Sequence, residues 1–527
     1  MLTLPAMPAR ARSARLGSAL AFTLALATPV DAAVDAAPDT PDQRVVLAAK
    51  AAAKATPPPP RLAAVVPANT FRPFSGLAVK PAPIDMLGMK YRAHSRHGLI
   101  SDWVLTAILY MLWAVIVLVL VYTARHYFFT LNRLFGTQRH PYLDIDTGDW
   151  PTVDVMVPAH NEEAVVADCL QALLDVDYPP HKLRIMAVND RSTDRTRSII
   201  DQFTERYPGR VHALHRVDNA TPGKAAALRD ATDLVSGDIM IMFDADYIPG
   251  RGLIRQLAAP FFDPEVGAVM GRVVPVNTGS NLLTRLLDME RSGGYQVDQQ
   301  ARMNLRLVPQ YGGTVGGVRR KALDAIGGWT MDTLAEDTDL TYRLLLKGWK
   351  TTYENRSECY EEVPEVWPVR LRQIMRWTKG HNQAAFRYAR QLLTSDKVSL
   401  RERLDGLLLL GVFAMSPILL FGWLLAATLF YFNTTDWLTG VFALLALMSY
   451  SALGNMAVFF EIAAAVYLDG SRRRIRLLPL NYLGFLVSLM AISKATLEQA
   501  VMPWFIERRI QWDKTSRYRQ SAGAAVK

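Results

Sequence analysis

The chain has 527 residues, of which 50% are hydrophobic, and its formal net charge is +10. Because the mean hydropathy of +0.08 is high for a soluble enzyme and the apolar residues stand in blocks flanked by arginines, the composition indicates membrane spans and contact with anionic lipid. The two cysteines, Cys169 and Cys359, stand far apart and match no metal-binding spacing, which excludes a disulfide framework. No basic stripe with interleaved aromatic residues supports nucleic-acid binding.

The first hundred residues are not expected to form a packed core. Residues 1–37 combine arginines, a short apolar run and small residues, which is the pattern of a signal peptide, with an uncleaved N-terminal anchor as the alternative. Residues 38–100 are rich in alanine and proline and are typical of a linker.

A transmembrane helix is predicted for residues 101–125. Its uncharged run, 103–123, is long enough to cross a bilayer. Arg125, Arg133 and Arg139 follow, so the positive-inside rule places the carboxyl end of this helix, and the residues after it, in the cytoplasm.

The pattern becomes that of a soluble α/β domain at residues 145–400. Strands are predicted at VDVMVPA, LRIMAVND, VHALHR, DIMIMFDAD and VGAVMGRVV, and helices between the early ones at EEAVVADCLQALLD, DRTRSIIDQFTERY and GKAAALRDATDLV. This alternation predicts a doubly wound, mostly parallel sheet, in which ligands bind beyond the carboxyl ends of the strands. Asp190, Asp244 and Asp246 all fall at predicted carboxyl ends.

These aspartates have two interpretations each. Asp244 and Asp246 follow an apolar strand and precede a Pro-Gly turn, so they form either a solvated loop or a site for a hard divalent cation, Mg²⁺ or Mn²⁺, bridging to substrate phosphates. Asp190 either belongs to a turn whose Ser192 or Thr193 caps the next helix, or accepts hydrogen bonds from a nucleotide.

Further charged residues stand at predicted helix starts. Glu336 and Asp337 begin a helix, where acidic groups suit the helix dipole, but a carboxylate at this place can also act as general base on an incoming hydroxyl. Lys224 begins another helix, where a cation is poorly placed unless an anion such as a phosphate is nearby.

An interfacial helix is predicted near residues 370–398. Gln373, Arg376 and Trp377 lie on one face of it. They form either an ordinary amphipathic interface or a site in which Arg376 binds diphosphate and Trp377 stacks on a sugar ring.

Residues 404–503 predict C-terminal transmembrane helices. The blocks at 407–432 and 437–468 are predicted to span, and for the block at 480–493 crossing is favoured over an interfacial helix. Residues 504–527 form a basic tail.

The motifs taken in order resemble glycosyltransferase family 2, in the processive membrane-bound branch that includes cellulose, chitin, hyaluronan and poly-N-acetylglucosamine synthases. The resemblance covers roughly residues 150 to 400 and the flanking helices, and it implies a GT-A-like fold. It rests on the ordered set VPAHNEE, NDRSTD, PGKAAAL, DAD, GGT, ED and Q-x-x-R-W.

This resemblance implies roles for individual residues. Asp337 is the expected catalytic base. The implied substrate-binding set is Glu162, Asp190, Lys224, Asp244, Gly313, Thr314, Glu336, Gln373, Arg376 and Trp377, and the implied metal ligands are Asp244 and Asp246. One departure is Ala335, where the family usually has threonine before Glu-Asp, and it puts the positioning of the acceptor in doubt.

The sequence therefore predicts a processive, inverting β-glycosyltransferase of the inner membrane, multi-pass and with a cytosolic catalytic domain. It is expected to polymerise a hexose from UDP-glucose or UDP-N-acetylglucosamine into an exported polysaccharide. Its expected partners are the UDP-sugar, the growing chain, membrane lipid, and periplasmic or regulatory subunits of an export complex. The alternatives are transfer of a single sugar to a lipid carrier, or a non-catalytic subunit of such a complex.

Overall fold

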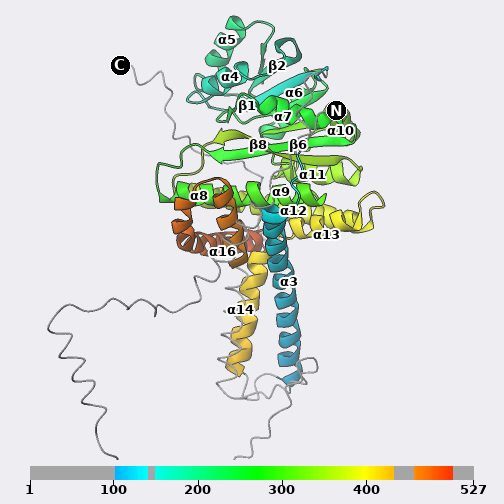
Figure 1. The fold of residues 1–527 in the computed structure, drawn as a ribbon, viewed down its shortest axis with the longest axis vertical. Coiled ribbons are helices and arrows are strands. Elements are labelled where there is room, and N and C mark those ends of the chain that lie inside the picture. The colour runs from blue at the N-terminus through cyan, green and yellow to red at the C-terminus, as the bar shows by residue number, and fades with distance from the viewer. Residues whose placement is uncertain (1–100, 141–148, 433–455, 502–527) are drawn as a thin grey trace, which may run out of the picture. The chain divides into compact units, whose positions relative to one another are not determined.

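The computed structural model of the protein describes residues 101–140, 149–432 and 456–501 (Figure 1). The predicted signal peptide or anchor, the linker, the basic tail and most of the apolar block at 437–468 lie outside these described residues. The predictions for those segments stay predictions.

The described residues contain one eight-stranded sheet, with the strand order β3-β2-β1-β4-β7-β6-β8-β5. Its strands are β1 (Val153–Ala159), β2 (Leu183–Asn189), β3 (Val211–His215), β4 (Ile239–Met242), β5 (Ile248–Pro249), β6 (Val266–Pro275), β7 (Gly316–Arg319) and β8 (Lys350–Glu361). The first four strands pair in parallel, as expected. The prediction of a mostly parallel sheet fails beyond β4, because β7 runs antiparallel to both β4 and β6.

The strands that the sequence did not reveal lack an apolar run. β7 reads GGVR, and β8 reads KTTYENRSECYE, so neither has the β-branched character by which the other strands are recognised. β5 has two residues only. These strands form because neighbouring strands supply their hydrogen bonds, and the sheet is therefore mixed.

Helices cover both faces of the sheet. They are α4 (Val166–Leu174), α5 (Thr196–Arg206), α6 (Lys224–Thr232), α7 (Leu253–Ala258), α10 (Arg320–Ala325) and α11 (Glu336–Leu346), with short 3₁₀ turns η1 (Pro180–Lys182) and η2 (Ala259–Phe262). Successive side chains of a strand point to opposite faces. Val155 of β1 accordingly packs with Leu170 of α4, whereas its neighbour Met156 packs in a second cluster with Leu228 of α6 and Leu340 of α11.

A further set of helices connects the sheet to the apolar segments. It comprises α8 (Leu282–Ser292), a π-helical turn η3 (Gly293–Gln299), α9 (Gln300–Leu305), α12 (Trp367–Thr394) and α13 (Leu400–Leu410). α12 contains the predicted interfacial segment and packs against α11, α13 and α16 (Leu478–Val501).

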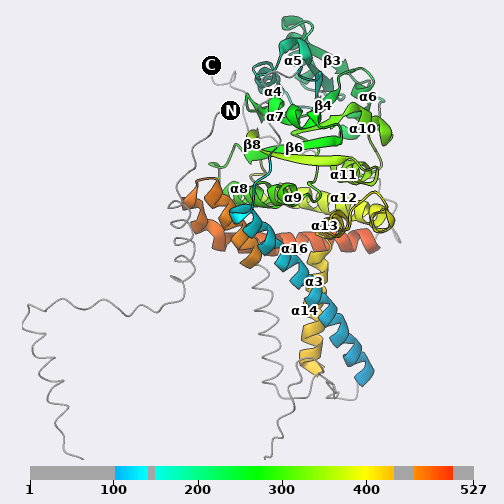
Figure 2. The same ribbon diagram turned by 45° about the vertical axis from the view of Figure 1, so that its right-hand side comes forward.

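The apolar helices α3 (Asp102–Phe135) and α14 (Met415–Phe432) lie side by side (Figures 1 and 2). α3 extends beyond its predicted end. Only 6% of its most apolar window is buried by the rest of the protein, so most of this surface needs an apolar solvent. Among the described residues two helices are long and apolar enough to cross a membrane, or three if a bent pair counts as one span. These apolar helices indicate membrane association.

The bent pair is the predicted span at 407–432. It consists of α13 and α14, which meet at 70°. Pro417 lies in the first turn of α14 and lacks the amide hydrogen that a continuous helix would donate to the carbonyl of residue 413. The chain consequently turns between the two helices instead of continuing straight.

α16 follows a 3₁₀ turn, η4 (Arg472–Leu477), and lies across α14 in both views (Figure 2). It packs along α12, where Lys379 pairs with Glu498 at 2.8 Å and Asn382 donates to Gln499 at 3.1 Å. Its composition allows a membrane span, but these polar contacts to α12 support the interfacial alternative.

Candidate active site

A single cavity of about 980 Å³ brings together residues from distant parts of the chain. Of the predicted site residues, it is lined by Glu162, Asp190, Lys224, Asp244, Asp246, Thr314, Glu336, Asp337, Gln373, Arg376 and Trp377. Gly313 does not line this cavity but adjoins it. Gly313 has φ +75°, and a Cβ atom at this position would lie 3.1 Å from the Asp337 Cβ. The predicted acidic groups therefore share one cleft.

The cavity lies at the carboxyl edge of the parallel strands. β1 and β2 end in register, with Ala159 opposite Asn189, and the amide of Asp190 donates to the Ala159 carbonyl at 2.8 Å. The end of β4 delivers Asp244, whose amide donates to the Thr314 hydroxyl at 3.2 Å. This edge is where parallel α/β sheets bind ligands.

Asp190 is held by two arginines at the bottom of this edge. It pairs with Arg216 at 2.5 Å and with Arg191 at 2.9 Å, and its second oxygen accepts the amide of Gly223 at 3.3 Å. Burial opposes ionisation of this group, but the two arginines hold the pKa of Asp190 below its usual range. Asp190 is therefore a fixed negative charge.

The capped-turn interpretation of this segment is wrong in one detail. α5 begins after Arg195 with no side-chain cap, so neither Ser192 nor Thr193 caps it. Instead the Ser192 hydroxyl accepts the amide of Asn161, and the Thr193 amide donates to the Asn161 side chain at 2.7 Å. These bonds tie the loop after β1 to the loop after β2.

Lys224 begins α6 and is surrounded by carboxylates. Its ammonium group pairs with Asp244 at 2.5 Å. Burial alone would lower the pKa of Lys224, but the charges of Asp244, Glu336 and Asp337 raise it. The cation that was poorly placed for the helix dipole is thus explained by the anionic cavity.

Asp244 and Asp246 present a donor set that fits a hard divalent cation. Both line the cavity and supply oxygen ligands, and Asp246 is only 3% exposed. Among the described residues no group of three or more His, Cys, Asp or Glu side chains is arranged to hold a metal ion. The chain therefore offers two carboxylates, which suits a cation that also takes oxygens from substrate phosphates and water.

Glu336 and Asp337 begin α11 and face the same cavity. One oxygen of Asp337 accepts the amide of Thr338 at 2.6 Å. Burial raises the pKa of Asp337. Burial and the charge of Asp337 raise the pKa of Glu336. The positive charges of Lys224 and Arg376 oppose both shifts. A carboxylate whose proton affinity is raised in this way suits a general base.

Trp377 of α12 lies against two guanidinium groups that the sequence did not single out. Arg291 of α8 and Arg370 of α12 lie 5.3 Å and 5.4 Å from the centre of its ring. Arg370 also donates to Gln373 at 2.9 Å, and Arg291 pairs with Glu361 at 2.8 Å. These contacts fix the indole in the cavity wall.

Sequence reasoning also missed His381 and Gln310, which line the cavity beside Asp337. His381 stands four residues after Trp377 and therefore on the same face of α12, so the motif itself contained a signal for it. Gln310 and Arg291 lie in segments without any local pattern that points to a site.

Residues 151–380 match the family described as "Glycosyltransferase like family 2". The chain is 29% identical to "Probable glycosyltransferase YdaM" of Bacillus subtilis over 380 residues, covering 70% of this chain and 88% of that protein. It is 35% identical to "Beta-monoglucosyldiacylglycerol synthase" of Synechocystis sp., covering 48% of this chain and 52%, about half, of that relative. Among solved structures, mannosyltransferase PcManGT from Pyrobaculum calidifontis, in complex with GDP-Man and Mn²⁺, is 22% identical with a TM-score of 0.48, covering 68% of this chain and 98% of that one. Residues 151–380 are thus similar to glycosyltransferase family 2, and the protein is a glycosyltransferase.

Proposed function

We propose that the protein is an inverting β-glycosyltransferase that uses a UDP-sugar from the cytosol and extends a polysaccharide processively at the inner membrane. The observation that carries this proposal is the continuity of the cavity. Its lining includes Asp190 and Lys224, Asp337 and Trp377, and Phe413 in the turn between α13 and α14. Donor, base and membrane helices therefore share one space.

The donor end of the cavity is assigned to the nucleotide. Asp190, already ionised and held by arginines, accepts hydrogen bonds from the uridine, and Lys224 and Arg376 face the diphosphate. Asp244 and Asp246 would hold Mg²⁺ or Mn²⁺, which when bound neutralises charge on the diphosphate leaving group. Glu162, Thr314 and Glu336 line the remaining walls.

The chemical step is assigned to Asp337. Its carboxylate takes the proton of the acceptor hydroxyl while the hydroxyl oxygen bonds to the anomeric carbon of the donor sugar. The bond from that carbon to the diphosphate breaks, and the configuration inverts. One base suffices for such a displacement. Gly313 has no side chain, so its backbone can lie directly against the Asp337 side chain.

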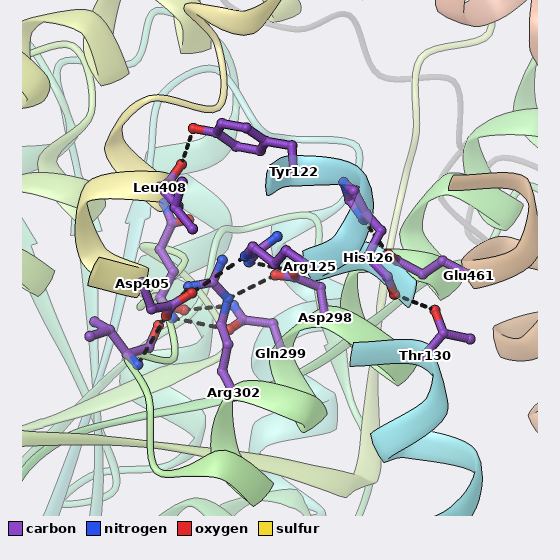
Figure 3. A network of polar contacts seen from close by, with 12 residues as sticks. Tyr122, Arg125, His126, Thr130, Asp298, Gln299, Arg302, Asp405, Leu408 and Glu461 are labelled. Carbon is purple, nitrogen blue, oxygen red and sulfur yellow. Dashed lines mark hydrogen bonds and ion pairs between the residues drawn. The ribbon is translucent and has the colours of Figure 1, made fainter. Parts of the chain in front are cut away.

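The acceptor is assigned to the arm of the cavity that leads past Trp377 to the membrane helices. Trp377 and Gln373, which both line the cavity, are assigned to the junction between donor and acceptor. Farther along, Arg125 pairs with Asp298 at 2.8 Å and His126 with Glu461 at 2.5 Å (Figure 3). These paired charges offer donors and acceptors to the hydroxyl groups of a carbohydrate chain that would find no partners in hydrocarbon.

A second candidate is the transfer of one sugar to a lipid. Its support is the 35% identity to a relative named for synthesis of a monoglucosylated diacylglycerol. The apolar side chains Val412, Phe413 and Ile462 in the membrane arm also suit an acyl chain. The complete Gln373-Arg376-Trp377 set favours the processive alternative, since single-sugar enzymes that resemble this family generally lack it.

The two candidates differ in their product. Purified full-length protein in lipid nanodiscs is supplied with Mn²⁺ and, in turn, with radiolabelled UDP-glucose and UDP-N-acetylglucosamine. A high-molecular-weight product that a linkage-specific glycosidase degrades supports the processive proposal. A chloroform-soluble product of one sugar supports the lipid candidate. The Asp337→Asn variant is the negative control, and incorporation by neither donor in the wild type contradicts both.

A further inference from the structure

His381 stands in the cavity wall one helical turn after Trp377. Its ring packs against Phe413, with ring centres 4.7 Å apart. Burial lowers the pKa of His381 to about 4, so the imidazole is neutral throughout the physiological range. A neutral imidazole has one nitrogen that donates and one that accepts, and its neighbours decide which is which.

The hydrogen bonds of His381 fix its tautomer. Nδ1 lies 3.2 Å from the carbonyl oxygen of Trp377, which can only accept. Nδ1 therefore carries the hydrogen, and Nε2 is the acceptor. Nε2 has one lone pair and lies 3.1 Å from the side-chain nitrogen of Gln310 and 3.3 Å from the hydroxyl of Thr338, so these two donors share it.

The hydroxyl of Thr338 stands between two acceptors. It lies 3.3 Å from Nε2 of His381 and 3.3 Å from Oδ1 of Asp337. One lone pair of this hydroxyl is already used, because Gln310 donates to it at 3.0 Å. Since the hydroxyl has a single hydrogen, it can donate fully either to the imidazole or to the carboxylate, but not to both.

Gln310 supports this arrangement from the other side. Its backbone amide donates to the Gln299 side chain at 3.0 Å, and the Gln299 side chain donates to its carbonyl at 2.8 Å. The amide nitrogen of its side chain is thereby aimed at Thr338 and His381 together. The cluster behind Asp337 is thus built of neutral groups that have few ways to rearrange.

We propose that His381 is a positioning residue that draws the Thr338 hydroxyl hydrogen away from Asp337 and so keeps the catalytic carboxylate a strong proton acceptor. A carboxylate that receives one hydrogen bond less is less stable as an anion and takes up a proton more readily. This inference rests on the proposed role of Asp337 as base.

Other ionisable groups also act on Asp337. Among the described residues they are Lys224 of α6, Arg376 of α12, Glu336 of α11, Tyr295 of η3 and Tyr311 of the loop before β7. These groups set the main level of its proton affinity, and replacing His381 by a neutral side chain leaves their charges unchanged. His381 therefore shifts the proton affinity of Asp337 relative to the value that these groups set.

The test is the acidic limb of the pH profile of kcat/KM, which reports the ionisation of the free enzyme's base. In His381→Phe the hydroxyl has only Asp337 to donate to, so the limb moves to lower pH by about one unit and kcat at the plateau falls about threefold. The KM for the UDP-sugar stays unchanged. His381→Gln, whose amide oxygen can accept, restores the limb, and His181→Phe at an exposed site in η1 leaves it in place.

Thr338→Val tests independently whether the Thr338 hydroxyl donates to His381 or to Asp337. If the wild-type hydroxyl donates to His381, its oxygen lone pair faces Asp337 and repels the carboxylate charge. Removing the hydroxyl then stabilises the carboxylate, and the acidic limb moves slightly to lower pH. A move to higher pH means that the hydroxyl donates to Asp337 and overturns the inference. His381→Phe placed on Thr338→Val should have no further effect, and a full second shift likewise overturns it.

The inference and the proposed function fail in different ways. If neither His381→Phe nor Thr338→Val shifts the acidic limb, His381 does not position the Thr338 hydroxyl, and Asp337 remains the base. If Asp337→Asn retains turnover, Asp337 is not the base, whatever the effect of the His381 variants. This comparison also covers the case in which His381→Phe does not fold, because Thr338→Val alone decides the sign.

Discussion

Gly380 of α12 touches Ala335, the residue directly before the acidic pair of α11. A Cβ atom at position 380 would lie 2.5 Å from the Ala335 Cβ and 2.8 Å from its backbone nitrogen. Alanine at position 335, where threonine was expected, and glycine at position 380 are both small. Together they let α12 pack directly against the backbone that carries Glu336 and Asp337.

Gly380→Ala should consequently displace the catalytic segment. Because backbone atoms block the added methyl group, the strain costs about 1–3 kcal/mol and the base moves away from the acceptor, so we expect kcat to fall at least about tenfold. Initial rates with the UDP-sugar measure this. Gly484→Ala in α16, where a Cβ atom meets only Trp367 at 4.0 Å, is the matched control and should keep wild-type rates.

Asp337→Asn should abolish turnover while sparing donor binding. The amide cannot take the acceptor proton, so we expect kcat to drop by about 10²–10⁴-fold, with UDP affinity within about threefold of the wild type. Isothermal titration with UDP and single-turnover kinetics measure the two effects. Asp332→Asn, which alters an exposed carboxylate paired with Arg387, serves as the control. Full polymer yield from Asp337→Asn would refute the assignment of Asp337 as the base.

Asp246→Ala should weaken the metal-dependent part of donor binding. With one of two carboxylates removed, the cation loses a ligand, so we expect the stimulation of UDP binding by Mn²⁺ to fall about tenfold, while binding in excess EDTA changes little. Equilibrium dialysis at several Mn²⁺ concentrations tests this. Asp263→Ala, an exposed aspartate in the loop before β6, should behave like the wild type. Equal loss with and without metal would contradict a metal role.

The pH dependence of activity should reflect the buried base. Burial raises the pKa of Asp337 above the ordinary aspartate value of 3.8, and the base must be deprotonated to act. Activity therefore rises with pH through this raised pKa and is lost as the pH falls below it. A profile of kcat/KM whose acidic limb lies at or below 3.8 would argue against Asp337 as the titrating group.

Arg302 should matter for stability, because it joins α9 to α13. This side chain, 2% exposed, pairs with Asp298 at 2.9 Å and with Asp405 of α13 at 2.7 Å (Figure 3). Arg302→Met leaves two carboxylates to share Arg125, and breaking buried pairs of this kind costs about 3–5 kcal/mol. Thermal unfolding in detergent should begin at a lower temperature than in Arg390→Met, an exposed control in α12. Equal unfolding temperatures would show that the network is dispensable.

The sequence alone predicted the elements with a strong local pattern. β1 to β4, the helices between them, α11 and the start of α12 were all expected from periodicity and turn residues. The site residues were expected too, some from charged residues at strand and helix ends, and the full set from the resemblance to glycosyltransferase family 2. The structure places all but Gly313 around one cavity, and Gly313 against Asp337.

The sequence did not predict elements whose cause is nonlocal. β7 and β8 have no apolar periodicity, and their pairing with β6 gives a mixed sheet. The turn between α13 and α14 interrupts a run of apolar residues that composition alone describes as one helix. Arg291 gains its significance only from the Trp377 ring that it faces, because no local pattern marks it.

By itself, then, the sequence determined the class of chemistry and the segments that carry it, since strands, helix starts and clustered carboxylates are set by neighbours along the chain. The tertiary structure decided which groups share a cavity, how close α12 comes to the acidic pair, and which acceptor the Thr338 hydroxyl meets. Contacts between residues far apart in the chain depend on how whole elements pack, and no local pattern records that packing.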